Sequence, residues 1–155
     1  MTSLPFDLGP YRCVERRGND EVSALYLAEQ RDGQSVAQVR LVRHFSTAAA
    51  ALDGFLPELK QAATRAATVD HPRVVRVHGY EQRGDDHLLV TDPLDGIDLR
   101  SLFDRLLASG EAMPWNIALR IGIDIAEALH DIRSTGVLHG GLSPENLWLT
   151  WRGEA

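Results

Sequence analysis

One stretch near the end of the chain gathers polar residues that could do chemistry. It reads His139-Gly140-Gly141-Leu142-Ser143-Pro144-Glu145-Asn146 and lies between two apolar segments, Val137-Leu138 and Leu147-Trp148-Leu149. An imidazole can order a loop or move a proton, and an amide oxygen can bind a hard cation such as Mg²⁺. We expect His139 to order the loop through hydrogen bonds, and Asn146 to be either a turn residue or a metal ligand.

A second group of charged residues lies in the first half of the chain. Arg40 follows Val36-Ala37-Gln38-Val39, and a polar segment runs from Gly18 through Asp20 and Glu21. A buried arginine could bind an anion, although an arginine on an exposed strand face is an equally ordinary interpretation. Gly18 taken alone is an ordinary turn glycine.

Alternation of apolar and polar residues predicts five β-strands with one helical segment after the third. The strands are expected at residues 11–15, 24–30, 36–42, 74–80 and 87–91. The helical segment covers residues 46–69, and we expect a break near Pro57 because proline removes a helical hydrogen bond. The first half of the chain therefore predicts an antiparallel sheet with one inserted helix.

Helical periodicity replaces alternation from Asp98 onward. Asp98 is expected to cap a short helix that ends at Gly110, and a longer helix is expected between Pro114 and Gly136. One face of the longer helix is an apolar stripe made of Ala118, Ile121, Ile125, Leu129 and Ile132. The opposite face, with Arg120, Asp124 and Asp131, is expected to face solvent.

This order of elements, closed by the stretch from His139 to Asn146, resembles a protein kinase domain. The loop signature of that family is H-R-D-L-x-x-x-N, and His139, Leu142 and Asn146 match its spacing. The resemblance implies an α+β fold: a kinase-like N-lobe with a five-stranded antiparallel sheet and one inserted helix, then the first helices of a truncated C-lobe. The implied divisions are an N-terminal extension (1–10), the N-lobe with its hinge (11–94) and an incomplete C-lobe (95–155).

The resemblance also implies that residues central to phosphotransfer have been replaced. The family's aspartate that accepts the substrate proton corresponds to Gly141, so no catalytic residue is expected there, and Ser143 stands where kinases often carry lysine. Arg40 is taken as the counterpart of the phosphate-binding lysine. The glutamate that pairs with this lysine corresponds to Ala62, while Glu58, one helical turn earlier, could pair with Arg40 instead.

The family's glycine-rich phosphate loop corresponds to residues 18–25, and of its glycines only Gly18 remains. Asp20 and Glu21 add negative charge where phosphates would lie. The adenine pocket is less altered, and the resemblance leaves a residual nucleotide-binding set of Gly18, Ala37, Arg40, Glu58, the gatekeeper Thr91 and the hinge residue Leu94. It also gives Asn146 the role of a residual magnesium ligand.

The bulk composition excludes several classes of protein. The formal net charge of −6 argues against nucleic acid or an anionic membrane as the main partner, because both require clustered positive charge. Cys13 is the only cysteine, which excludes an intrachain disulfide and a multi-thiolate metal site. With no apolar stretch long enough for a signal peptide or a membrane span, a cytoplasmic location is expected.

We therefore expect a pseudokinase-type interaction module with no required cofactor, weak or no binding of ATP and Mg²⁺, and no phosphotransfer. Its partner would be a protein, either another kinase or a second copy of the chain. The stripe of Ile121, Ile125, Leu129 and Ile132 is the expected interface because an uncovered apolar patch favours association. Two alternatives stay open: an atypical active Ser/Thr protein kinase and an unrelated α+β ligand-binding domain.

Overall fold

The computed structural model describes residues 3–33 and 35–153, without the side chains of Val36 and Ala37. The chain divides into two compact units. The first unit runs to Thr68 and resumes from Arg76 to Pro93, and the second contains Val69–Val75 and everything from Leu94 onward. The two units are described separately below.

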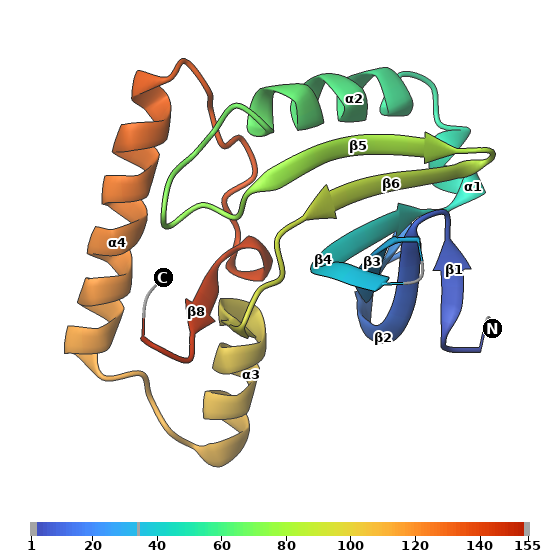
Figure 1. Cartoon of the computed structure of the whole chain (residues 1–155). Coiled ribbons are helices and arrows are strands. Elements are labelled where there is room, and N and C mark those ends of the chain that lie inside the picture. Colours follow the sequence, from blue (N-terminus) through green and yellow to red (C-terminus); the bar gives the residue numbers. More distant parts are fainter. Residues whose placement is uncertain (1–2, 34, 154–155) are drawn as a thin grey trace. The chain divides into compact units, whose positions relative to one another are not determined.

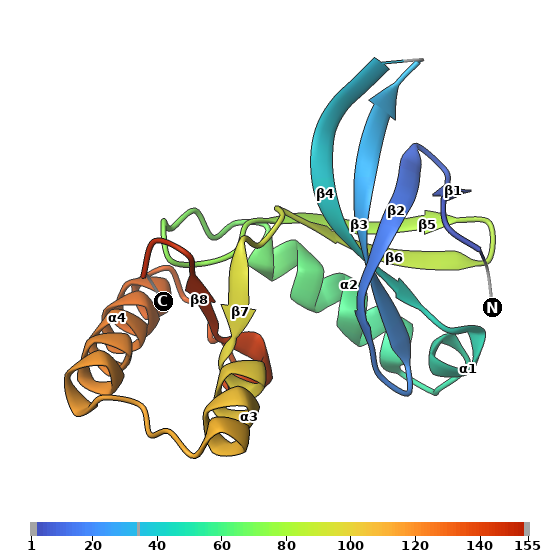
Figure 2. The ribbon, with the colours of Figure 1, turned by 90° about the horizontal axis from the view of Figure 1, so that it is seen from below.

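The first unit is a curled antiparallel sheet with two helices (Figures 1 and 2). Its strands follow the spatial order β1-β2-β3-β4-β6-β5. Helix α2 runs alongside β5 in Figure 1. The elements of this unit are β1 (Phe6–Leu8), β2 (Tyr11–Asn19), β3 (Ser23–Asp32), β4 (Ser35–Phe45), α1 (Thr47–Ala50), α2 (Phe55–Ala66), β5 (Val77–Arg83) and β6 (Asp86–Thr91).

Strand β1 was not predicted, because the segment before Tyr11 was taken as an extension. It pairs with β2 through Phe6 opposite Cys13 and Leu8 opposite Tyr11. Three residues are too few to show an alternation pattern, so only the pairing with β2 defines this strand. The predicted α+β kinase-like fold is confirmed, with six strands in the sheet instead of five.

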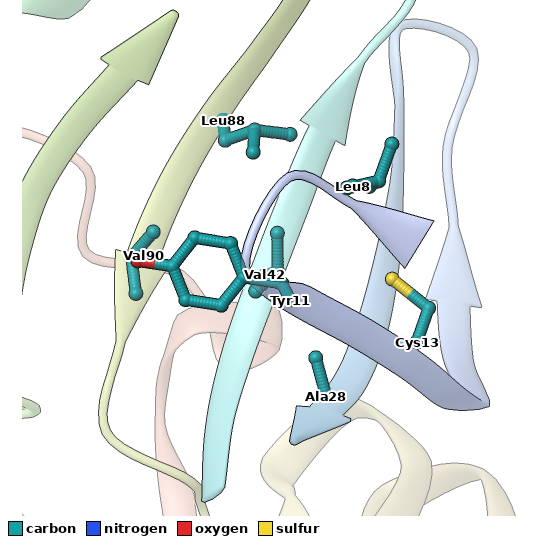
Figure 3. Packing of buried hydrophobic residues seen from close by; sticks show 7 residues of the cluster. All are labelled: Leu8, Tyr11, Cys13, Ala28, Val42, Leu88 and Val90. Carbon is teal, nitrogen blue, oxygen red and sulfur yellow. The ribbon is translucent and has the colours of Figure 1, made fainter. Parts of the chain in front are cut away.

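A cluster of buried hydrophobic residues lies on one face of this sheet (Figure 3). Its buried members come from five strands: Leu8, Tyr11, Cys13, Ala28, Val42, Leu88 and Val90. Burial, together with the nearby Asp7 carboxylate, raises the pKa of the Cys13 thiol to about 11. Cys13 is therefore a packing residue that stays protonated at neutral pH.

Helix α2 packs on the opposite face of the sheet. Phe55 meets Phe45 of β4 with ring centroids 5.4 Å apart, and the Lys60 ammonium lies 5.1 Å from the centre of the Tyr80 ring on β5. The helix begins after Gly54, which has a φ of 77° that favours glycine. The predicted break is present at residues 51–54, a few residues before Pro57, and the firm helix expected after it is α2. Pro57 falls in the first turn of α2, where its missing N–H has no helical partner to lose.

The second unit contains a short hairpin and two long helices. Its elements are β7 (Gly96–Asp98), α3 (Leu99–Ser109), α4 (Trp115–Ser134), the 3₁₀ turn η1 (Pro144–Asn146) and β8 (Trp148–Thr150), with β7 and β8 paired antiparallel. The predicted cap at Asp98 is confirmed, since its carboxylate accepts a hydrogen bond from the Ser101 N–H at 2.8 Å. Gly110 ends α3 with a φ of 71°.

Helix α4 buries most of the predicted apolar stripe, and only its first member, Ala118, is exposed. Ile121 and Ile132 are buried, and Ile125 and Leu129 are half-buried. The predicted solvent exposure of Asp124 is wrong, because only 2% of this residue is exposed. Arg73 Nη2 and Arg120 Nε lie 3.2 and 3.1 Å from its Oδ1 oxygen and neutralise its charge inside the unit.

The segment Val69–Val75 belongs with the second unit because it is tied to α4. His71 Nε2 lies 3.1 Å from Asp131 Oδ2, and Arg73 pairs with Asp124. Among the described residues, no helix is both long and apolar enough to cross a bilayer.

We predict that Gly96→Ala destabilises the protein, by roughly 1–3 kcal/mol, because an added Cβ would lie 2.2 Å from the Leu149 carbonyl oxygen across the hairpin. Gly122→Ala is the matched control. It adds the same methyl group to an exposed position of α4 where no atom lies within 4 Å, and should stabilise by about 0.5–1 kcal/mol. Thermal unfolding followed by circular dichroism measures both, and equal effects of the two substitutions would contradict the close approach at Gly96.

Candidate functional site

The face of the sheet that carries α2 is defined by the alternation of side chains along β4. Phe45 packs against α2, so Arg43 and Leu41, two and four residues earlier, point to the same side. Thr91, the predicted gatekeeper, pairs with Leu41 and shares this face. The face toward α2 therefore combines Thr91, Leu41 and the basic residue Arg43.

Arg40 lies on the opposite face, among the core residues. It pairs with Ala28, which is fully buried, and Arg40 is two residues from the buried Val42. Its Nη1 group donates to Asp92 Oδ1 at 3.1 Å, and His78 Nε2 lies 2.7 Å from the same oxygen. The Arg40 guanidinium also donates to the side chain of Gln38.

The suggested pair between Arg40 and Glu58 is therefore not formed. Glu58 belongs to α2, on the other side of the sheet, and its side chain is exposed with no ion pair among the described residues. Arg40 and Thr91, both assigned to nucleotide binding, likewise lie on opposite faces. The reason is local, since neighbouring strand residues point to opposite sides and Arg40 is adjacent to Leu41, the partner of Thr91.

Sequence reasoning missed Val39, which shares the α2 side of β4 with Leu41. The V-A-I-K signature has its lysine two residues after alanine, because both side chains must reach the same face. Counted from Val36-Ala37, that position is Val39, which is 43% exposed. Correct spacing alone would have indicated an apolar residue where kinases need a cation.

Ala37 coincides with a bulge in β4, since Gln30 pairs with Gln38 and Arg31 pairs with Val36. Because of this extra residue, the alternation of side chains between the two faces of the sheet is not continuous with the part of β4 that precedes it. The prediction that Ala37 lines an adenine pocket concerns its side chain, which lies outside the described part of the chain.

The loop between β2 and β3 is held together by Asp20. Its Oδ1 oxygen accepts hydrogen bonds from the backbone N–H groups of Val22 and Ser23, at 2.9 and 2.6 Å. Arg43 Nη1 lies 3.1 Å from the other oxygen, Oδ2. Gly18 belongs to β2 and does not have a positive φ, so its conformation does not require glycine.

The ionised form of Asp20 is the one these contacts favour. Partial burial disfavours the charge, but the hydrogen bonds from Val22 and Ser23 and the charge of Arg43 outweigh it and lower the pKa of Asp20. A lowered pKa in the folded state means that this stabilisation is present at neutral pH and is lost as the pH falls through the folded value.

The stretch from His139 to Asn146 forms a compact exposed loop in the second unit. The Gly141 N–H donates to His139 Nδ1 at 3.3 Å, and Asn146 Nδ2 donates to the Gly141 carbonyl oxygen at 2.8 Å. His139 thus orders the backbone of the loop. The contact of Asn146 through its nitrogen leaves its Oδ1 oxygen as the atom that could bind a metal ion.

Glu145 carries the only carboxylate between His139 and Asn146, and this carboxylate forms an ion pair. Its Oε1 oxygen lies 2.9 Å from Arg100 Nε on α3. Its own backbone N–H, the Arg100 guanidinium and the Ser143 hydroxyl together lower the pKa of Glu145 to about 2. A carboxylate with so low a pKa is a poor general base.

The structure therefore brings together some of the predicted residues and separates others. His139, Gly141, Ser143 and Asn146 share one loop, while Thr91, Arg40 and Gly18 belong to different parts of the first unit. Leu94, the predicted hinge residue, is the first residue after the end of the first unit and is half-buried.

Similar proteins are serine/threonine kinases, although no family model matches the chain. The chain is 33% identical over 149 residues to serine/threonine-protein kinase pkn2 of Myxococcus xanthus, which covers 96% of this chain and 17% of that protein. It is 29% identical over 143 residues to serine/threonine-protein kinase PkaB of Streptomyces coelicolor, covering 92% of this chain and 32% of the relative. The crystal structure of the PknI kinase domain of Mycobacterium tuberculosis superposes with a TM-score of 0.76 at 23% identity, over 98% of this chain and 59% of that one.

The sheet with α2, the loop signature at His139–Asn146 and these likenesses define a protein of the kinase class. The chain belongs to the protein kinase superfamily. It spans about a sixth of the length of pkn2 and a third of PkaB.

We predict that Arg40 is coupled energetically to Asp92 and not to Glu58. A double-mutant cycle with Arg40→Met and Asp92→Asn should give a coupling of about 1 kcal/mol, since the Arg40 side chain is only 13% exposed. The matched cycle with Glu58→Gln should be additive within about 0.5 kcal/mol, because the two side chains lie on opposite faces. Urea unfolding measures both cycles, and coupling of Arg40 to Glu58 would contradict this arrangement.

Proposed function

We propose that the chain acts as a pseudokinase-type protein-interaction or regulatory module, without phosphotransfer and with weak or no binding of ATP and Mg²⁺. The observation that carries this proposal is Gly141, which stands in the catalytic loop where the family has its proton-accepting aspartate. Glycine has no group that could orient or deprotonate a hydroxyl. Glu145 does not replace it, because Arg100 holds its carboxylate.

The phosphate-binding side of the site supports the same proposal. On the α2 side of β4 the lysine position is taken by Val39, and Arg40 is engaged by Asp92 on the other face. The loop amides that would receive phosphate in a kinase are bonded to Asp20. The residues present therefore do not fit a bound triphosphate, and Asn146 alone is a weak site for its magnesium ion.

A binding role needs a surface, and α4 offers one. The side of α4 that faces away from its buried residues carries a stripe of exposed residues. These residues lie within an arc of about 100° around the helix axis. We call this the outer stripe of α4; its residues are Trp115, Leu119, Gly122, Ile123, Ala126 and His130. Trp115, Leu119 and Ile123 are 78%, 55% and 45% exposed.

The outer stripe is complementary to a second copy of itself. In an antiparallel pair of α4 helices centred between Gly122 and Ile123, Leu119 faces Ala126 and Ile123 faces Gly122. Large side chains then meet small ones, as close helix packing requires, and the arrangement has the two-fold symmetry of most homodimers. We therefore assign the partner as a second copy of the chain. A reducing cytoplasmic setting agrees with the single thiol, Cys13.

We predict no transfer of labelled phosphate from ATP to a protein substrate by the full-length protein. Asn146→Ala, which removes the residual metal ligand of the loop, is the control. Transfer that Asn146→Ala abolishes would favour the alternative, an atypical active Ser/Thr kinase. Gly141→Asp tests the missing base separately, because it places a carboxylate at that position. A side chain fits there, since the atom nearest to the added Cβ would be Asn146 Nδ2 at 3.9 Å. The variant should therefore fold with an unchanged melting temperature.

We predict concentration-dependent dimers in sedimentation velocity, which Ile123→Glu weakens at least about tenfold by burying a charge at the centre of the helix pair. Leu107→Glu is the matched control. It makes the same apolar-to-acidic change at an exposed position of α3, 77% accessible, outside the outer stripe. A monomer at all concentrations, or equal effects of both substitutions, would contradict self-association through α4.

A further inference from the structure

The turn between β2 and β3 contains backbone donors that converge on one point. The N–H groups of Val22 and Ser23 both reach Oδ1 of Asp20, and the Ser23 hydroxyl lies 3.1 and 3.0 Å from the two carboxylate oxygens. Arg43 Nη1 donates to Oδ2 at 3.1 Å and to Ser23 Oγ at 3.0 Å. Five donor contacts therefore surround one carboxylate group.

This donor set has the chemistry of an oxyanion site. Two consecutive backbone N–H groups that share an acceptor form the kind of concavity that binds phosphate and carboxylate, and a guanidinium strengthens it. Only 6% of Ser23 is exposed, so its hydroxyl is a fixed part of the fold and not a mobile surface group. Arg43 reaches the loop from β4, on the α2 side of the sheet.

We propose that Val22, Ser23 and Arg43 form an oxyanion-binding site whose occupant in this chain is the carboxylate of its own Asp20. The class of ligand that the site would otherwise take is a phosphate-type oxyanion. The internal carboxylate competes at a high effective concentration because a three-residue turn tethers it to the donors. This inference rests on the proposed function, for which it supplies a reason why phosphate is refused.

A comparison of Asp20 with its neighbour Glu21 distinguishes this explanation from a simple effect of charge. Both contribute one negative charge to the same loop, but only Asp20 accepts the amide hydrogen bonds. Glu21 is exposed and has no side-chain hydrogen bond or ion pair within the described residues. A general repulsion of anions would therefore depend on both residues equally.

The experiment is a titration of each variant with inorganic pyrophosphate, followed by the ¹⁵N–¹H shifts of Val22 and Ser23 and by calorimetry. Asp20→Ala frees the donors and should bind pyrophosphate at least about tenfold more tightly than the wild type, with both amide signals shifting on binding. Glu21→Ala should stay within about twofold of the wild type. Asp20→Asn should also stay near the wild type, because its amide oxygen still accepts from the two N–H groups.

Arg43→Gln in the Asp20→Ala background should remove most of the gain, which shows that the anion sits where the carboxylate was. Equal gains for Asp20→Ala and Glu21→Ala would overturn the proposal in favour of net charge, and so would tight pyrophosphate binding by the wild type. An Asp20→Ala protein with a native melting curve and no gain would overturn it as well. Pyrophosphate lacks adenine and a transferable γ-phosphate, so this titration does not test phosphotransfer. The proposed loss of phosphotransfer at Gly141 is tested separately by the transfer assay with labelled ATP.

Discussion

The alternation of side chains along β4 governs the chemistry of the first unit. Val42 lies in the core beside Val90, and Phe45 packs on α2, so alternation along β4 determines the side of the sheet to which each residue from 38 to 45 points. Arg40 falls on the core side and Arg43 on the side of α2. No adjustment of rotamers can exchange them, because moving one basic residue to the other face would require a register slip that exposes the whole core.

Each basic residue in the middle of β4 has an internal counter-ion. Asp92 holds Arg40, and Asp20 holds Arg43. A site that binds phosphate keeps a cation available for its ligand, whereas here the positive charges are neutralised within the fold. The apolar Val39 lies at the remaining position on the α2 side. The first unit thus keeps the framework of a nucleotide-binding lobe, and its charges serve the stability of the sheet and the β2–β3 turn.

The second unit shows the same separation of framework and chemistry. His139 and Asn146 still bond to the backbone of Gly141, and Arg100 secures the turn through Glu145. The close approach of Gly96 to Leu149 ties β8, which follows this loop, to β7. All these contacts preserve the shape of a catalytic loop without its acid, which agrees with a role that depends on binding. The outer stripe of α4 is the apolar surface that we propose for that role.

The sequence by itself determined the kinase-like fold, the loop from His139 to Asn146 and the absence of a side chain at Gly141, because spacing, turn residues and residue identity are local properties. It also predicted the cap at Asp98, which depends only on residues 98–101. Tertiary structure alone decided that Asp92 is the partner of Arg40, that Asp124 is buried, that residues 6–8 form a strand and which side of α4 remains exposed. Each of these depends on residues distant in sequence: Asp92 reaches Arg40 from the segment after β6, and Arg73 neutralises Asp124 from another segment. A pattern within one strand or helix carries no information about the partner that covers it.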